Sequence, residues 1–256
     1  MSETIEENTE LSAVDSLHEE MDNDDLDSAQ EIIAALHPSE IADVIESMPG
    51  RGRENIWQLV DTELEGEVLS HMQDAVRTEM LENMHPYEVA DATKDLDADD
   101  VADILQDLPE EVADTILLSM DDQNRQRLAS VLTYPENSAG GLMNIDVVSV
   151  RADVSLDVVM RYLRLLGEIP SKTDILMVVD RDNHYLGVLP LTELLVRSLE
   201  TTVGEWMEEQ TCFSADMAAT EVAKTFEQRD LVSAAVVDEQ GLLLGRITID
   251  DVVDVI

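Results

Sequence analysis

The chain has 256 residues, of which 44% are hydrophobic, so it is long and apolar enough for two domains with real cores. It carries 58 acidic against 15 basic side chains, which gives a formal net charge of −43. Such a charge repels nucleic acid and anionic membranes and attracts cations, so nucleic-acid binding is the first function class to be excluded. A solvated acidic surface explains most of these carboxylates, but it does not explain repeated spacing.

Cysteine content and hydropathy limit the setting of the chain. Its single cysteine, Cys212, excludes an internal disulfide framework and a thiolate zinc site, and it favours a reducing compartment. The N-terminus lacks a basic region followed by an apolar run, and nowhere do about 18 apolar residues follow one another. We therefore expect no signal peptide and no membrane span in these residues, and a soluble chain.

The first half of the chain has a helical pattern. Residues 1–27 are acidic and contain no Lys or Arg, which predicts a disordered tail. From residue 28 to residue 133 the apolar side chains recur at intervals of three and four, as at Val101, Ile104, Leu105 and Leu108. This spacing predicts an all-helical N domain of short helices stacked into a superhelix.

A short phrase of an acid, Ile or Val, Ala and Asp recurs in this region. It occurs at residues 40–43, 88–91, 100–103 and 111–114, and Pro38, Pro86 and Pro109 stand just ahead of three copies. A first helical turn tolerates proline, and acids at a helix start interact favourably with the helix dipole. For most copies we prefer this structural reading. His37 and His85, which each precede a proline, are read as structural in the same way.

The composition changes at residues 134–141, where Pro135 and two glycines break the helical pattern. Beyond this boundary the sequence predicts a unit of strand, helix, strand, strand and helix that occurs twice. In each copy a Val-Val-Asp run is followed by a glycine seven residues after the Asp, at Gly187 and Gly245. We expect one α/β module with copies at residues 134–200 and 201–256.

The doubled unit resembles a pair of CBS domains, known as a Bateman module. Gly245 opens the sequence Gly-Arg-Ile-Thr-Ile-Asp-Asp, which matches the CBS signature Gly-x-x-Thr-x-x-Asp at Thr248 and Asp251. Tyr134 opens the more specific sequence Tyr-Pro-Glu-Asn-Ser-Ala-Gly-Gly-Leu-Met-Asn, which lies between the helical domain and this pair. Because this sequence follows the helical domain, the chain resembles the cytosolic part of MgtE-type magnesium channels. The resemblance runs from about residue 28 to the last residue.

The resemblance implies a regulatory role. In that family the N domain and CBS pair precede a connecting helix and a transmembrane pore, and they close the pore when intracellular magnesium is abundant. It also implies a homodimer through the CBS domains and a location on the cytoplasmic side of the cell membrane. The pore domain of the full-length chain is then a partner that these residues do not include.

The acidic pattern Asp-Asp-Val-x-Asp-aliphatic occurs at residues 99–104 and again at residues 250–255. Carboxylates three or four residues apart share one face of a helix, as Asp99 does with Asp103 and Asp251 with Asp254. If two such helices face each other, each carboxylate pair repels by about 4 kcal/mol at about 4 Å and an effective dielectric near 20. A divalent cation reverses the sign of this interaction.

Magnesium suits such a site because it takes oxygen ligands and needs only one or two direct carboxylates. A His-Cys cluster for zinc and an EF-hand loop for calcium are both absent from the sequence, although Mn²⁺ or Ca²⁺ could occupy the same oxygen sites. The resemblance implies Mg²⁺ ligands between the domains at Asp99, Asp103, Asp230, Asp251 and Asp254, with Asp100 and Asp250 as neighbours. Ala218 and Thr220 stand where the family can place acids, so one auxiliary site is in doubt.

The alternative function is an adenosine-nucleotide sensor whose acidic surface only confers solubility. Thr248 and Asp251 complete the CBS signature for ribose binding in the second copy. The first copy has Pro190 in place of the Thr and Glu193 in place of the Asp, and Glu193 could still accept the ribose hydroxyls. The charge of −43 disfavours a polyphosphate such as ATP that arrives without a cation. An enzyme ranks third, because the sequence indicates no nucleophile, oxyanion donor or substrate pocket.

Overall fold

The computed structural model describes residues 17, 26–106, 108–253 and 255. The predicted acidic tail of residues 1–27 therefore lies mostly outside the described residues. The chain divides into two compact units, which are considered separately below. The first unit holds residues 1–96 and 103–125, and the second holds residues 97–102 and 126–256.

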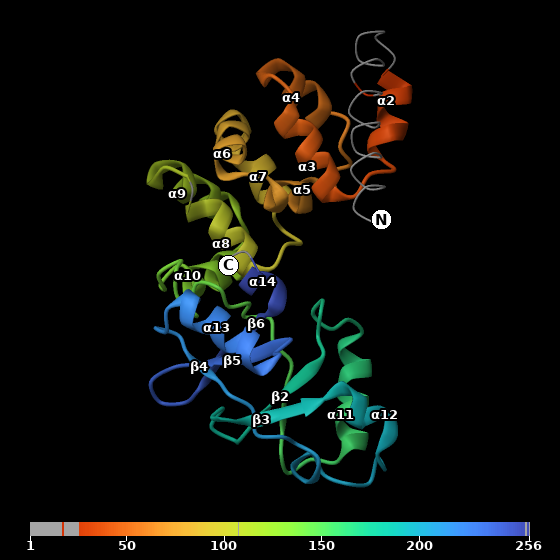
Figure 1. The fold of residues 1–256 in the computed structure, drawn as a ribbon, viewed down its shortest axis with the longest axis vertical. Coiled ribbons are helices and arrows are strands. Elements are labelled where there is room, and N and C mark those ends of the chain that lie inside the picture. Colours follow the sequence, from red (N-terminus) through yellow and green to blue (C-terminus); the bar gives the residue numbers. More distant parts are fainter. Residues whose placement is uncertain (1–16, 18–25, 107, 254, 256) are drawn as a thin grey trace. The chain divides into compact units, whose positions relative to one another are not determined.

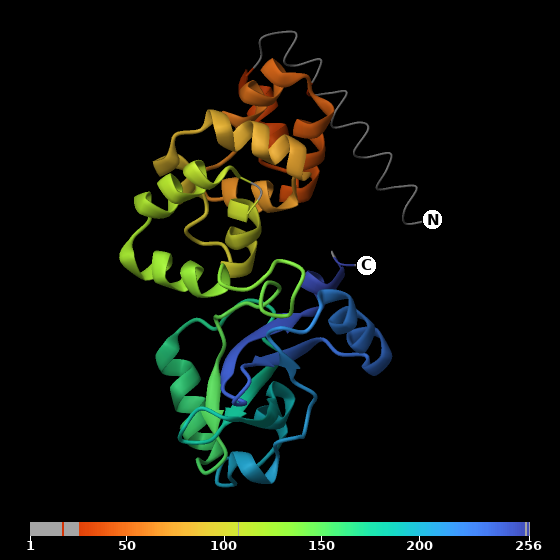
Figure 2. The same cartoon turned by 90° about the vertical axis from the view of Figure 1, so that its left-hand side faces the viewer.

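The described part of the first unit is helical (Figure 1). Its elements are α2 (Leu26–Ile33), α3 (Pro38–Ser47), α4 (Gly50–Trp57), α5 (Glu65–His71), α6 (Asp74–Asn83), α7 (Pro86–Ala92), the end of α8 (Ala98–Gln106), α9 (Glu110–Ser119) and the start of α10 (Asp122–Val131). Figure 2 shows these short helices, in orange to yellow-green, crossing one another at steep angles. The prediction of an all-helical N domain is confirmed.

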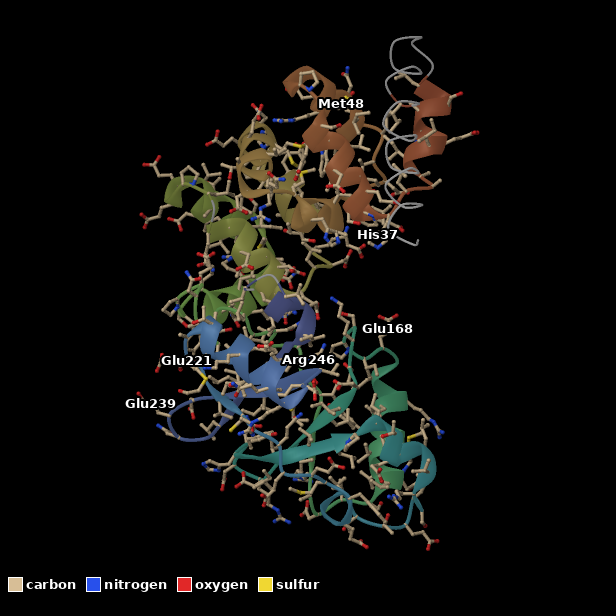
Figure 3. The ribbon with its side chains drawn as sticks, viewed as in Figure 1. His37, Met48, Glu168, Glu221, Glu239 and Arg246 are labelled. Carbon is tan, nitrogen blue, oxygen red and sulfur yellow. The ribbon has the colours of Figure 1, made fainter. Side chains whose placement is uncertain are left out.

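Two of these helices begin with the same histidine-proline cap. At α3 the His37 ring nitrogen accepts a hydrogen bond from Ser39 N–H, and Glu40 accepts one from the N–H of His37 at 2.7 Å. The start of α7 repeats this capping box with His85, Pro86 and Glu88. His37 and Met48 mark the two ends of α3 (Figure 3). The histidines therefore satisfy backbone N–H groups at helix starts, as the structural reading predicts.

The second unit contains two three-stranded sheets with the order predicted for the repeat. The first copy has β1 (Ser149–Arg151), α11 (Leu156–Leu166), β2 (Ile175–Val179), β3 (Tyr185–Pro190) and α12 (Leu191–Val196). The second has β4 (Phe213–Ser214), α13 (Ala219–Arg229), β5 (Ser233–Val237), β6 (Leu243–Thr248) and α14 (Ile249–Val253). In each sheet the first strand is parallel to the central one and the third is antiparallel to it.

Both faces of the central strands are buried, which explains their continuous apolar sequence. Leu176 and Val178 of β2 join a core cluster with residues of α11 and α12. Met177 and Val179, which point to the other face, pack in a cluster that also contains Ala235 of β5. The sheets of the two copies therefore pack against each other with their helices outside, and the prediction of a CBS pair is confirmed.

The boundary phrase at residues 134–141 forms a tight turn against the second copy. The Ser138 hydroxyl donates to Pro135 O at 2.6 Å and accepts from Gly141 N–H at 3.2 Å. The next residue, Ala139, donates its N–H to Met217 O at 2.7 Å. A Cβ at Gly141 would lie 2.5 Å from the carbonyl oxygens of Pro135 and Glu136, so only glycine fits without moving backbone.

Substitution Gly141→Ala is expected to destabilise the second unit by about 1–3 kcal/mol, because backbone must shift to admit the methyl group. Thermal unfolding followed by circular dichroism measures this. Gly50→Ala, at the start of α4, is the control. A Cβ there would make only an ordinary van der Waals contact of 3.5 Å, with the side chain of Glu79. Equal melting temperatures for the two variants would contradict the account of the turn.

Candidate metal centre

The two acidic phrases contribute residues to the same compact unit. Residues 97–102, which include the first turn of α8, cluster with the second unit, as does α14. Both helices carry aspartates in their first turns, Asp99 and Asp100 on α8 and Asp250 and Asp251 on α14. Acids at these positions interact favourably with the helix dipole, which explains locally why both helices begin there.

Asp99 is a buried carboxylate without sufficient hydrogen-bond partners. The residue is only 6% exposed, and its Oδ1 atom is buried and accepts no hydrogen bond from the described residues. Burial raises its pKa well above the usual range, and the charges of Asp251, Asp100 and Asp97 raise it further, against a backbone hydrogen bond that lowers it. The ionised form of Asp99 therefore lacks the partners that a buried charge requires.

Asp251 is also a carboxylate whose ionised form burial disfavours, but it has hydrogen-bond partners. Its Oδ2 atom accepts hydrogen bonds from Thr248 N–H at 2.8 Å and from the Thr248 hydroxyl at 2.9 Å. Burial raises the pKa of Asp251 to about 6, because the hydrogen bonds from Thr248 only partly offset burial and the charges of Asp250 and Asp100. The two acidic phrases thus meet at Asp99 and Asp251, where like charges and burial both disfavour ionisation.

Asp250 has a cationic partner. Lys172 forms an ion pair with it through Nζ, and Asp250 Oδ1 lies 2.6 Å from the Thr248 hydroxyl. Burial raises the pKa of Asp250, but the hydrogen bonds from Lys172 and Thr248 outweigh burial, so the pKa is lowered overall. Asp250 therefore stays ionised more readily than Asp99 or Asp251.

Arg246 holds the segment that carries Lys172. This arginine of β6 is 3% exposed and lies inside the second unit (Figure 3). It donates to Ser171 O at 2.5 Å, to Lys172 O at 3.3 Å and to Thr173 Oγ1 at 3.3 Å. Sequence reasoning missed both basic residues. Arg246 lies within the CBS signature, but nothing in the pattern indicates that it reaches a loop more than 70 residues earlier.

The other predicted ligands are Asp103, Asp230 and Asp254. Asp103 is exposed and belongs to the first unit. Asp230 is exposed and follows α13 in a left-handed conformation, with a φ of 51°. The hydrogen bonds and ion pairs described above do not include it. Asp254 lies outside the described residues. Of the seven predicted ligands, the described structure brings together Asp99, Asp100, Asp250 and Asp251.

The donor set of this acidic centre, defined as Asp99, Asp100, Asp250 and Asp251, fits a hard divalent cation. All its side-chain donors are carboxylate oxygens, which Mg²⁺ and Ca²⁺ prefer. The unpartnered Oδ1 atom of Asp99 supplies a lone pair that no described residue uses. A cation there would neutralise the like charges that burial disfavours.

The predicted nucleotide residues also serve in local structure. Asp251 accepts hydrogen bonds from the backbone N–H and the hydroxyl of Thr248 at the start of α14, so the CBS signature also satisfies a backbone N–H at a helix terminus. In the first copy, Glu193 Oε2 accepts from Arg197 Nε at 2.5 Å, and the guanidinium of Arg197 lies 3.7 Å from the ring centre of Trp206. Glu193 therefore has a cationic partner within its own copy.

A further cluster, Asp180, Asp182 and His184, has metal-like spacing in the hairpin between β2 and β3. Asp180 accepts hydrogen bonds there from the N–H groups of Asp182 and His184, at 2.8 and 2.9 Å. Asp238 makes the same turn in the second copy, where Gln240 and Leu242 donate. Because both copies use an Asp in this way and only one has a histidine, the cluster is explained by turn structure.

The first unit contains a cavity of about 730 Å³ between α4, α6 and α7. Trp57, Met80 and Tyr87 line it, together with an ion pair between Arg53 and Glu79. None of the predicted metal or nucleotide residues lines this cavity. Among the described residues, no helix is both long enough and apolar enough to cross a membrane.

Comparison with known proteins identifies both parts of the chain. The model of the MgtE intracellular N domain matches residues 36–137, and that of the CBS domain matches residues 139–200 and 203–256. The magnesium transporter MgtE of Thermus thermophilus is 31% identical over 245 residues, covering 94% of this chain and 54% of the relative. The chain thus spans about half the length of that relative.

Two solved structures share the fold over nearly the whole chain. One is the cytosolic domain of the Mg²⁺ channel MgtE in complex with ATP, which is 30% identical with a TM-score of 0.87, covering 95% of this chain and 100% of that one. The other is the soluble part of a magnesium transporter, with 22% identity and a TM-score of 0.81, covering 96% and 97%. The chain therefore belongs to the MgtE family and contains its intracellular N domain and its CBS pair.

Proposed function

We propose that this chain is the magnesium-sensing regulatory region of an MgtE transporter, and that Mg²⁺ binds at the acidic centre. The observation that carries the proposal is Asp99, a buried carboxylate with an unpartnered oxygen beside the charge of Asp251. The names of the relatives supply magnesium as the ion. A divalent cation converts this repulsion into attraction, and water bound to the cation can reach the remaining carboxylates.

Helix α8 provides the link to the first unit. Its first turn clusters with the second unit, and residues 103–106 of the same helix belong to the first. Bound Mg²⁺ holds this first turn to α14, whereas loss of the ion restores repulsion between Asp99 and Asp251. The ion thereby biases a two-state element, which we propose to be the closed and released states of the regulatory region.

We further propose that the full-length protein is a membrane transporter and that this region acts on the cytoplasmic side. The Thermus relative is a named magnesium transporter with about as much sequence again outside the matched part. A pore domain on the same chain is then the element that the closed state controls. Asp103, Asp230 and Asp254 remain proposed Mg²⁺ ligands.

A homodimer through the CBS domains is supported by an exposed apolar stripe. Val158, Tyr162 and Leu165 stand three or four residues apart along α11, and Leu165 is 84% exposed. Leu195 and Val196 on α12 of the same copy are 81% and 71% exposed. Monomeric soluble proteins rarely leave such continuous apolar surface uncovered, so we propose that a second copy of the chain packs on it.

Nucleotide sensing is the second candidate function. The observation in its favour is the 30% identical cytosolic domain that was solved in complex with ATP. Calorimetry with ATP in EDTA and with MgCl₂ alone separates the candidates. ATP binding that survives substitution of the acidic centre favours the nucleotide sensor, whereas Mg²⁺ binding that is lost on the same substitution favours the magnesium sensor.

Millimolar MgCl₂ is expected to raise the melting temperature by several degrees and to reduce the radius of gyration, because an ion that binds only the folded state stabilises it. Asp99→Asn and Asp251→Asn should each melt higher than the unsubstituted protein in EDTA, since they remove repulsion, and should lose most of the Mg²⁺ response. Calorimetric melting and small-angle X-ray scattering measure the two effects.

Glu239→Gln is the matched control for these variants, because it removes one exposed acid from the hairpin between β5 and β6 (Figure 3). It should respond to Mg²⁺ as the unsubstituted chain does. Added NaCl at the same ionic strength controls for screening. A scattering radius that is identical in EDTA and in Mg²⁺, together with equal melting shifts for all variants, would overturn the proposal.

In EDTA, the pair Asp99 and Asp251 is expected to make the second unit more stable at acid than at neutral pH. The pKa of Asp251 in the folded state is about 6, above the ordinary value of 3.8 for an aspartate. Protonation of Asp251 therefore stabilises the folded state. This stabilisation is fully present below about pH 4 and is lost as the pH rises through about 6, and it amounts to no more than about 3 kcal/mol.

Urea unfolding between about pH 7 and about pH 4 measures this dependence. Comparison with Asp251→Asn isolates it, because the other carboxylates titrate in both proteins. The stability difference between the two should shrink as the pH falls. If the difference in unfolding free energy stayed constant across this range, the raised pKa of Asp251 would be contradicted.

Leu165→Lys is expected to shift the chain from dimer to monomer without loss of folded structure, because the side chain is 84% exposed. Sedimentation velocity reports the mass. Leu118→Lys is the control, as it places the same charge at a leucine of α9 that is 72% exposed in the first unit. A dimer that persists in Leu165→Lys would exclude this stripe as the interface.

A further inference from the structure

A lysine side chain lies at the acidic centre. Lys172 pairs with Asp250 through Nζ. Burial lowers the pKa of Lys172, but the hydrogen bond to Asp250 and the charges of Asp250, Asp251 and Asp100 outweigh it and raise the pKa. The ammonium group is thus close enough to three of the four acidic-centre residues to interact with their charges.

The backbone of Lys172 has a left-handed conformation, and hydrogen bonds from Arg246 hold the loop around it. Its φ is +54°, in the left-handed region that side chains other than glycine rarely adopt. Arg246 donates to the residues on both sides and to the carbonyl oxygen of Lys172 itself. Because Arg246 is buried, the root of the lysine side chain is held beside Asp250.

We infer that Lys172 is a tethered counter-ion that competes with the divalent cation for the acidic centre and so sets the concentration at which the cation binds. This inference rests on the proposed function, since it concerns the affinity of that same centre. In the absence of the divalent ion the ammonium offsets part of the repulsion among the carboxylates. When the ion enters, it takes over Asp250 and the ammonium moves to solvent.

Exposure of the side chain permits this exchange. The Lys172 side chain is 60% exposed and that of Asp250 is 41% exposed, so the ammonium can be rehydrated as soon as it leaves. Its single charge favours a divalent over a monovalent competitor, because only the divalent ion brings more charge to the site than the lysine does. The tether keeps the lysine at high effective concentration, so bulk monovalent salt displaces it poorly.

The effect on affinity follows from the strength of such pairs. A partly exposed ion pair changes an equilibrium constant by roughly two- to fivefold. Removing the charge of Lys172 should therefore lower the half-saturating concentration of Mg²⁺ by roughly two- to fivefold. Lys172→Arg keeps the charge and should stay close to the unsubstituted chain.

Titration of the metal-free chain with MgCl₂ by isothermal calorimetry tests the inference. Lys172→Met and Lys172→Asn are both expected to bind more tightly; asparagine tolerates the left-handed backbone, so strain in one variant does not decide the result. Lys224→Met is the matched control, because it removes the same charge from an exposed site on α13 of the same unit. Thermal melts in EDTA confirm that each variant is folded.

Two outcomes overturn the inference. Either both neutral variants at position 172 bind Mg²⁺ with the affinity of the unsubstituted chain, or Lys224→Met tightens binding as much as they do, in which case only overall charge matters. Failure of the proposed function looks different, because Mg²⁺ binding to the unsubstituted chain would then be unchanged by Asp99→Asn and Asp251→Asn.

Discussion

A carboxylate removed from water is stable only when protonated, hydrogen-bonded or paired with a cation, and Asp99 meets this condition least well. Its helix position and its burial are fixed by packing, since neighbouring residues Ala98 and Ala102 are almost fully buried on the same helix. The fold therefore holds a charge where it is costly. Such a cost is useful in a sensor, because the free energy that a ligand recovers is the free energy that distinguishes the two states.

The two copies of the CBS unit differ at the acidic residue of the CBS signature, which in the second copy is Asp251, close to Asp99. Both copies have the same strand order, the same Asp-based hairpin turn and a glycine seven residues after that Asp. In the first copy the acid of the signature, Glu193, is paired with Arg197, the residue that follows the same helix. In the second copy α14 carries no basic residue, and Lys172, which interacts with the charge of Asp251, belongs to the first copy. The acid of the signature is thus paired within its own copy in the first unit of the repeat, whereas in the second it interacts with a lysine of the other copy.

Sequence reasoning recovers the elements well because they depend on local patterns. The helices of the N domain, the order of the repeated unit and the break at Pro135 follow from periodicity and from residues with restricted backbone. It also finds Asp99 and Asp251, because a repeated phrase is visible without a structure. It cannot find Lys172 or Arg246, since their roles come from contacts across more than 70 residues that leave no periodic signal. The burial of Asp99 but not of Asp103, one turn later on the same face of α8, likewise leaves no signal in the sequence.

The division of α8 between the two compact units has a thermodynamic consequence. A helix of nine residues is too short to be stable alone in water, so it persists only while packing supports it. Residues 98–102 take that support from the second unit and residues 103–106 from the first. Melting of either unit removes packing from a helix that the other also needs. The stability of α8 therefore depends on the folding of both units.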